Sequence, residues 1–341
     1  MQRLPRFKYL GPGSLDEALS LLKKHDGDIK ILAGGTDLLP SMKQKLHRSM
    51  HVLDLKRIDG LREIKNGLEK ETDIGALTPL AAIEESAEIK KKFPALAEAA
   101  GLVAAPQIKN MGTIGGNIAL DTRCWYFNQS HFWRKSIEAC LKTGGEVCHV
   151  VQSGKRCYAS FVADTVPALL ALNARVRIRD LEGERQCLLQ QIYTQDGKAP
   201  HTLKAGQVIT GVTLPPPENQ SGSSYQKLRL REAISFPLAG AAAHVVLDGD
   251  RFREVKIVLG AAGSGPIEVT EAAALLKGAP ITEDLIEEAA SKARQAARPV
   301  PNMKLSPAYR RKMAGILAKR ALREAIRRAK GLTDDQRGLI Q

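Results

Sequence analysis

The stretch Ile29-Lys-Ile-Leu-Ala-Gly-Gly-Thr-Asp-Leu-Leu39 has the pattern of a short strand that passes through a glycine loop into a helix. Adjacent glycines let backbone N–H groups approach a phosphate with no Cβ atom in the way, and a helix start adds a favourable dipole. Thr36 can donate a hydroxyl hydrogen bond, and Asp37 is expected to cap the helix. The segment therefore indicates a small α/β unit with a phosphate-binding turn or a tight turn without a ligand.

A second glycine loop, Met111-Gly-Thr-Ile-Gly-Gly-Asn-Ile118, has a similar composition. Two such loops that converge would suit the pyrophosphate of a dinucleotide. Neither loop matches the G-x-G-x-x-G or Walker A pattern. The residues alone therefore do not separate FAD from another dinucleotide.

Three parts are expected along the chain: residues 1–55, residues 56–217 and residues 224–332. Ser14 is a candidate N-cap with Glu17 at the capping-box position, and the polar segment 218–224 marks a boundary. Periodicity predicts these strands and helices: strands at 29–32, 51–55, 62–65, 73–77, 175–179, 208–214, 224–231, 239–247 and 253–259; helices at 14–22, 79–85, 94–100, 166–172, 269–276, 282–297 and 306–330.

The composition, 43% hydrophobic and 26% charged, is that of a globular protein. The first residues carry no secretory signal pattern and no apolar run is long enough to span a membrane, so we expect a cytoplasmic protein with reduced thiols. The net charge is +14, and nine of the basic residues lie at 310–330 on an amphipathic helix. This face is expected to be solvated or to contact an acidic partner; nucleic acid is not expected, because no binding motif is present.

Four of the five cysteines fall within one stretch with the spacing C-x15-C-x7-C-x8-C, namely Cys124, Cys140, Cys148 and Cys157. Four thiolates can hold a [4Fe–4S] cluster or a structural zinc ion, although zinc sites usually contain closely spaced cysteine pairs. Uncoordinated core cysteines remain a third interpretation. Both tryptophans, Trp125 and Trp133, lie in the same stretch and could shield a metal centre from water. Cys187, outside the stretch, is expected to be a core residue.

Together the motifs resemble the FAD-binding subunit of the xanthine dehydrogenase family of molybdenum hydroxylases. The matching segments follow the family order over nearly the whole chain: Phe7-Lys-Tyr with Pro12, Ser14-Leu-Asp-Glu-Ala18, Ala33–Leu38, Thr113–Ile118, Asp164-x-x-Pro-Ala-Leu-x-Ala-Leu172 and Tyr309-Arg-Arg-x-Met313. The resemblance implies an α+β fold, with a two-part PCMH-type FAD-binding domain followed by a CO-dehydrogenase-flavoprotein-like C-terminal domain.

The resemblance also implies a set of FAD contacts. The two glycine loops would surround the pyrophosphate, Asp164 would face the ribityl or isoalloxazine region, Lys227 would lie near the flavin ring, and Ile209 would border the adenine. Lys227 could instead be a solvated strand residue, and Ile209 a core residue. The complete expected set is Leu32, Ala33, Gly34, Gly35, Thr36, Asp37, Leu38, Gly112, Thr113, Ile114, Gly115, Gly116, Asn117, Asp164, Ile209 and Lys227.

The chain departs from the usual family pattern in one place. Asn117 and Asp164 are separated by a long insert, residues 121–160, which contains the four clustered cysteines. This arrangement is similar to the beta subunit of 4-hydroxybenzoyl-CoA reductase, which carries an extra [4Fe–4S] cluster. The resemblance therefore assigns the four cysteines to such a cluster.

By that resemblance, the chain is a cytoplasmic electron-transfer subunit with FAD and a [4Fe–4S] cluster and without a catalytic residue of its own. It would accept electrons from a ferredoxin-like donor and assemble with a large molybdopterin-binding subunit and a small [2Fe–2S] subunit as a dimer of heterotrimers. The complex would remove the phenolic hydroxyl of an aromatic acyl-CoA. Two alternatives stay open: another molybdenum enzyme with the opposite electron flow, and a zinc-stapled scaffold without flavin.

Overall fold

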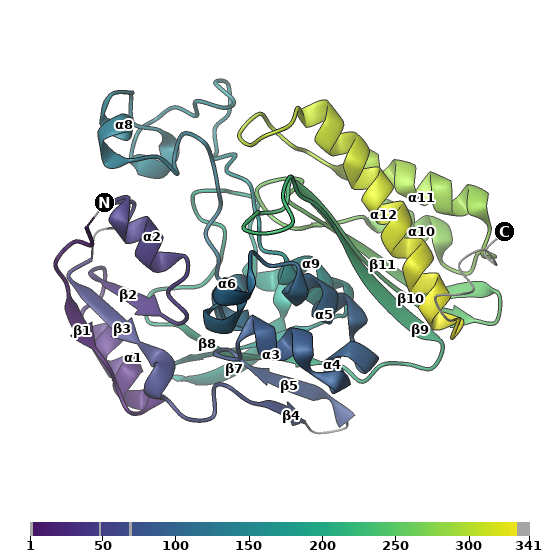
Figure 1. The fold of residues 1–341 in the computed structure, drawn as a ribbon, viewed down its shortest axis with the longest axis horizontal. Helices are drawn as coiled ribbons and strands as arrows, with labels where there is room; N and C mark the ends of the chain where they lie inside the picture. Colours follow the sequence, from purple (N-terminus) through teal and green to yellow (C-terminus); the bar gives the residue numbers. More distant parts are fainter. Residues whose placement is uncertain (1–2, 48, 68–69, 333–341) are drawn as a thin grey trace.

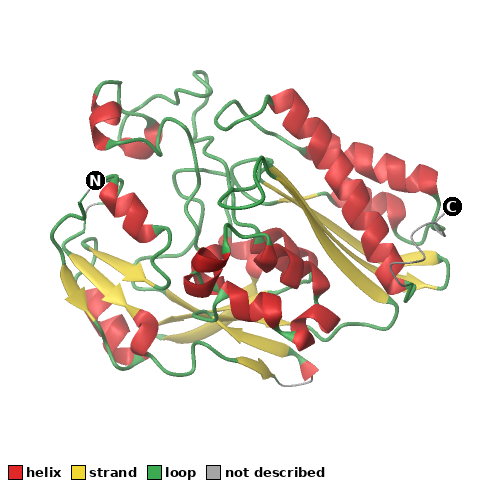
Figure 2. Ribbon diagram, in the orientation of Figure 1, coloured by secondary structure: helices red, strands yellow, loops and turns green. Residues whose placement is uncertain are grey.

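The computed structural model describes residues 3–47, 49–67 and 70–332. Within these residues the chain forms three sheets, each with its own helices, in the order of the sequence (Figure 1). Figure 2 shows that long loops, rather than helices or strands, make up most of the insert, residues 121–160. The fold is therefore α+β, as expected.

The first unit is a three-stranded parallel sheet in the order β1-β3-β2. Its elements are β1 (Lys8–Leu10), α1 (Leu15–Lys24), β2 (Ile29–Leu32), α2 (Leu38–Lys43) and β3 (His51–Asp54). Ser14 caps α1 by accepting a hydrogen bond from the N–H of Glu17, as predicted. The Glu17 carboxylate accepts from the N–H of Gly13, so the predicted capping box is displaced by one residue.

The second unit is a five-stranded antiparallel sheet in the order β4-β5-β8-β6-β7. Its strands are β4 (Ile64–Asn66), β5 (Thr72–Gly75), β6 (Arg175–Asp180), β7 (Gly183–Leu188) and β8 (Val208–Leu214). The helices of this unit and of the insert are α3 (Leu80–Glu85), α4 (Ala87–Lys92), α5 (Pro94–Gly101), α6 (Pro106–Met111), α7 (Ile114–Ile118), α8 (His131–Lys135, in the insert) and α9 (Thr165–Ala171).

The third unit is a four-stranded antiparallel sheet in the order β12-β11-β10-β9. Its elements are β9 (Ser221–Leu228), β10 (Ala239–Asp248), β11 (Arg251–Gly260), β12 (Ile267–Glu268), α10 (Thr270–Leu276), α11 (Glu283–Ala296) and α12 (Pro307–Ala329). One face of the sheet packs on α10 and α12, and α11 packs against these two helices (Figure 1). The other face meets α5 and α9, so Tyr225, Ala242 and Val258 belong to the core of the second unit.

The turn predicted at 218–224 is shorter in the structure, because β9 already begins at Ser221. A Cβ atom on Gly222 would lie 2.1 Å from the carbonyl oxygen of Ala325 in α12, so the glycine permits close packing of strand and helix. The hydroxyl of Ser223 is buried and accepts a hydrogen bond from the N–H of Ala95. Small polar residues here line a buried strand rather than a linker.

Several basic residues of α12 and of its C-cap, Lys330, have partners on other elements, while Arg327 and Arg328 also pair with Glu324 on α12 itself. Arg310 is buried, and its guanidinium donates to the carbonyl oxygens of Leu238, Val300 and Ala261. Further ion pairs join α12 to α11, α5 and the β10–β11 turn: Arg323 with Glu283, Arg328 with Glu98 and Lys330 with Asp250. Many of the basic side chains in this region are therefore paired within the chain.

Among the described helices, none combines the length and the apolar character needed to cross a membrane.

Candidate functional site

The loop between β2 and α2 contains a run of backbone donors that have no partner among the described residues. Gly35 has φ of +75°, the left-handed conformation that occurs in anion-binding turns. Within the described residues, no acceptor is paired with the N–H groups of Gly34, Gly35, Thr36 and Asp37, and the Asp37 side chain does not cap α2. Consecutive unpaired N–H groups beside the start of a helix are suited to an anion such as a diphosphate.

The second glycine loop, at the start of α7, is held by its own hydrogen bonds. Thr113 caps α7, and its hydroxyl accepts from the N–H of Gly116 at 3.1 Å. The N–H of Gly115 donates to the carbonyl oxygen of Ala76 at 2.8 Å, and a Cβ atom on Gly115 would lie 2.8 Å from the Cβ of Ala76. The loop is therefore pinned against the segment after β5, where only glycine fits.

The structure brings the two glycine loops into direct contact. A Cβ atom built on Gly34 would lie 1.9 Å from the carbonyl oxygen of Met111, and one on Gly112 would lie 3.5 Å from Oγ1 of Thr36. Gly34 is required because the two backbones approach so closely, whereas the tight contact of Gly112 is with the carbonyl oxygen of Ile108, at 2.9 Å. The two glycine loops, which come from two separate units of the fold, thus lie against each other and form one cradle.

Asn117 and Asp164 lie at the ends of the insert and are both buried. Oδ1 of Asn117 accepts from the N–H and the hydroxyl of Thr165, at 3.2 and 2.7 Å. This side chain therefore joins α7 to the start of α9 and closes the base of the insert. The described hydrogen bonds of the Asn117 side chain go to Thr165, and none goes to the 34–37 loop.

Asp164 forms a buried network with two residues of β9. Its Oδ1 accepts from the hydroxyl of Tyr225 at 2.8 Å, and its Oδ2 accepts from Nζ of Lys227 at 2.9 Å. Burial raises the pKa of the Asp164 carboxyl, and the charge of Lys227 opposes that rise. The Lys227 side chain is 1% exposed and also donates to the carbonyl oxygens of Leu102 and Ser235. The alternative of a solvated Lys227 is therefore wrong.

Ile209, on β8, lies in the hydrophobic core of the second unit and is 8% exposed. It is a core residue, and its expected contact with adenine stays a prediction. Cys187, on β7, packs against the same core, as expected.

Three of the four clustered thiols are buried, and Cys140 is half-buried. Burial raises the pKa of Cys124, while the backbone N–H groups of Tyr126 and Phe127 oppose the rise. The pKa of Cys124 is raised further by the charges of Cys140 and Cys148, so these three groups lie within electrostatic range of one another.

Cys157 belongs to the same group. Burial raises its pKa to about 11, the N–H of Ala159 and the charge of Lys142 act in the opposite direction, and Cys124 and Cys148 raise it further. N–H groups directed at sulfur stabilise thiolate ligands and tune iron–sulfur centres. Cys124, Cys148 and Cys157 thus lie within electrostatic range of one another.

Among the described residues, no three His, Cys, Asp or Glu side chains are arranged to hold one metal ion. Each cysteine of a [4Fe–4S] cluster binds a different iron, so cluster ligands stand farther apart than the ligands of a single ion. The iron–sulfur assignment stays a prediction. Nε2 of His149, a histidine of the insert, lies 2.7 Å from the carbonyl oxygen of Glu138.

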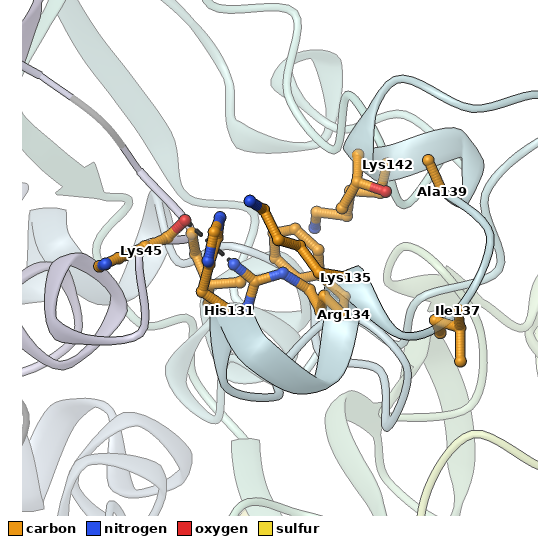
Figure 3. Close-up of a pocket in the computed structure, with 10 residues that line it drawn as sticks. Lys45, His131, Arg134, Lys135, Ile137, Ala139 and Lys142 are labelled. Carbon is orange, nitrogen blue, oxygen red and sulfur yellow. Dashed lines mark hydrogen bonds between the residues drawn. The ribbon is translucent and has the colours of Figure 1, made fainter.

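A basic pocket lies between the insert and the residues that follow α2 (Figure 3). Its volume is about 590 Å³, and its described lining is Lys45, Leu46, Phe127, His131, Arg134, Lys135, Ile137, Ala139, Lys142 and Thr143. Arg134 donates to the carbonyl oxygens of Gln44 and Lys45 and so attaches α8 to the first unit. The pocket lies where the insert contacts the first unit, which carries the first glycine loop.

Two residues of the site were missed by the sequence reasoning, Arg123 and Phe236. The Arg123 guanidinium forms an ion pair with Asp37, and its Cζ lies 4.8 Å from the centre of the Phe236 ring. Burial lowers the pKa of Arg123 to about 10, so it stays charged near neutral pH. The available signal was the position of an arginine directly before the first clustered cysteine.

Comparison with known proteins places this geometry in a family. The model of the FAD-binding domain in molybdopterin dehydrogenases matches residues 5–217, and that of the CO dehydrogenase flavoprotein C-terminal domain matches residues 223–325. The carbon monoxide dehydrogenase medium chain of Hydrogenophaga pseudoflava is 30% identical, over 94% of this chain and 97% of that protein. Subunit alpha of the 6-hydroxypseudooxynicotine dehydrogenase complex of Paenarthrobacter nicotinovorans is 29% identical, over 96% of each chain.

Solved structures agree with the sequence matches. A carbon monoxide dehydrogenase structure from Hydrogenophaga pseudoflava superposes with a TM-score of 0.79 at 27% identity, over 95% of this chain and 98% of that one. Among the described residues, the N–H groups of the 34–37 loop are unpaired and Gly34 leaves no room for a side chain, and this arrangement fits the diphosphate of FAD. The protein therefore belongs to the family of FAD-binding subunits of molybdenum hydroxylases that includes xanthine dehydrogenase and CO dehydrogenase.

Proposed function

We propose that the chain carries FAD and a [4Fe–4S] cluster as the electron-transfer subunit of a molybdenum-containing reductase similar to 4-hydroxybenzoyl-CoA reductase. Its partners would be a large molybdopterin-binding subunit and a small [2Fe–2S] subunit, in a cytoplasmic dimer of heterotrimers. A ferredoxin-like protein would supply the electrons. The complex would release the phenolic hydroxyl of an aromatic acyl-CoA as water, which consumes an electron pair and two protons.

The observation that carries this proposal is the position of the cysteine group next to the flavin cradle. Cys124 directly follows Arg123, and Arg123 is paired with Asp37 of the first glycine loop. When bound, a flavin exchanges electrons singly or in pairs and an iron–sulfur cluster exchanges them singly, which is the chemistry of a relay. A thiol group at this place supports electron transfer into or out of the flavin.

The chain's own residues would bind and enclose these groups. The N–H groups of the 34–37 loop would hold the diphosphate, and Gly34 and Gly112 would keep the two loops in contact. The N–H groups directed at Cys124 and Cys157 would stabilise their thiolates against the low polarity of a buried site. Phe127 packs with Cys124 and Cys157 and would exclude water from them.

A second candidate keeps the subunit but reverses the electron flow, so that the complex oxidises its substrate. The names of the similar proteins favour it, because they include dehydrogenases for carbon monoxide and nicotinate and a hydroxylase for nicotine. The zinc-stapled scaffold has less support, because no described group of side chains is arranged around one ion and the FAD-binding domain is present.

Assay of the assembled complex in both directions tests the proposal. The proposed function predicts that reduced ferredoxin and 4-hydroxybenzoyl-CoA give benzoyl-CoA, and that the flavin and cluster signals are reduced before product appears. Substrate-driven reduction of the flavin, with no turnover from reduced ferredoxin, would support the oxidative candidate and contradict the reductase.

A further inference from the structure

Arg123 lies where three parts of the chain meet. Its guanidinium pairs with Asp37 of the first unit and stacks on Phe236 of the β9–β10 loop, with 4.8 Å from Cζ to the ring centre. Its backbone N–H and carbonyl both bond to Ser160, at 2.8 and 2.7 Å, which closes the insert at its base. The next residue, Cys124, is the first of the clustered cysteines.

Asp37 makes an anion site in the first glycine loop difficult. The N–H of Asp37 is the last of the four unpaired donors, and its carboxylate does not cap α2. A diphosphate bound by these donors would therefore lie close to a carboxylate of the same sign. Because the Asp37 side chain is only 31% exposed, solvent and salt would screen that repulsion incompletely.

The Arg123 guanidinium removes this difficulty. It pairs with the Asp37 carboxylate while its own side chain is 17% exposed, so the positive charge is held in place by the stack on Phe236 and by the closed base of the insert. Its Nε is buried and, within the described residues, donates to no acceptor. The arginine comes from the insert, so the insert completes the charge balance of the cradle.

We propose that Arg123 is a positioning residue of the FAD site that acts through Asp37. It neutralises the carboxylate beside the diphosphate loop, and it couples the order of the insert to flavin binding because it is continuous with Cys124. The inference rests on the part of the proposed function that places the diphosphate in the 34–37 loop. It holds whether or not the cysteines bind iron.

FAD titration of the full-length chain, freed of flavin, tests the first half of the inference. Arg123→Met should weaken FAD binding by at least about tenfold, and Arg123→Lys should retain most of the affinity. Asp37→Asn added to Arg123→Met should restore most of the loss, because no carboxylate then remains to be neutralised. The affinity of Arg123→Met alone should improve as salt rises.

Arg156→Met is the matched control. Arg156 also precedes a clustered cysteine, Cys157, and its Cζ lies 5.2 Å from the ring centre of Tyr158, but its described hydrogen bond goes to the carbonyl oxygen of Gln195. The FAD affinity of Arg156→Met should equal that of the wild type. If Arg123→Met does not fold, the FAD affinity of the double variant, which leaves no unpaired charge, is compared with that of the wild type instead.

Limited proteolysis tests the coupling. FAD should protect the insert of the wild type and of Arg156→Met from cleavage, and should protect it much less in Arg123→Met at saturating FAD. Wild-type affinity in Arg123→Met, or no recovery in the double variant, would overturn the inference while leaving the FAD role intact. A wild-type chain that binds no FAD would remove both.

Discussion

Asp164 and Lys227 form an ion pair of 2.9 Å that is almost fully buried between α9 and β9. The pair joins the FAD-binding part of the chain to the C-terminal part, and Tyr225 adds a hydrogen bond to the same carboxylate. Each polar group of the pair has a partner inside the protein, which is the condition for keeping two charges out of water. The pair thus fixes how the C-terminal sheet sits against the FAD-binding domain.

Lys227→Met is expected to destabilise the protein by about 3–5 kcal/mol, because it leaves a buried carboxylate without its counter-charge. Adding Asp164→Asn should recover part of this loss, since the remaining carboxamide carries no charge. Urea unfolding of the single and double variants measures both effects. Equal stability of Lys227→Met and the wild type would contradict the description of this pair.

Gly34→Ala is expected to weaken FAD binding at least tenfold, since the added Cβ would meet the Met111 carbonyl oxygen at 1.9 Å and separate the loops. Gly13→Ala is the control on the same unit, because the nearest atom to its Cβ, Oε2 of Glu17, is 3.9 Å away. Flavin content after gel filtration reports the difference. Full flavin retention in Gly34→Ala would show that the two loops do not form the site.

Cys140→Ser is expected to abolish the iron–sulfur absorption and to leave FAD in place. The described contacts of Cys140 are local, to Thr143, Gly145 and Val147, and none reaches the glycine loops. Cys187→Ser, at the half-buried cysteine of β7, should keep both signals. Unchanged iron in Cys140→Ser would remove this cysteine from the proposed ligand set.

His244, on β10, is expected to make stability fall in acid. Burial lowers its pKa to about 4, Glu218 acts against this and Lys256 adds to it. Between pH 6.5 and about 4 the unfolded chain binds a proton that the folded protein does not, so stability falls as pH falls, by up to about 1.4 kcal/mol per pH unit. His244→Gln should show a smaller loss over that range in urea unfolding at several pH values. Identical pH profiles for the two proteins would contradict the assigned shift.

Local patterns were sufficient to predict most helices and strands, because glycine loops, caps and apolar periodicity act over a few residues. They failed at Ser221–Ser224, where the residues are polar and small because α12 packs closely on the strand. They also left out the acidic partners of α12, such as Glu98 and Glu283, which are distant in sequence.

The glycines and cysteines of the candidate site could be predicted from the sequence, but the contacts between them could not. Proximity of Gly34 to Met111 and of Arg123 to Asp37 depends on how separate units pack, which no local pattern encodes. Lys227 was identified from a family resemblance, but its burial became evident only from the Asp164 pair.

The composition of the anoxically purified protein decides whether FAD and a [4Fe–4S] cluster occupy one chain. Iron, acid-labile sulfide, zinc and flavin are measured per chain, together with the visible spectrum. The account predicts one FAD with about four irons and about four sulfides, and no stoichiometric zinc. One zinc without iron, or FAD with neither iron nor sulfide, would contradict it.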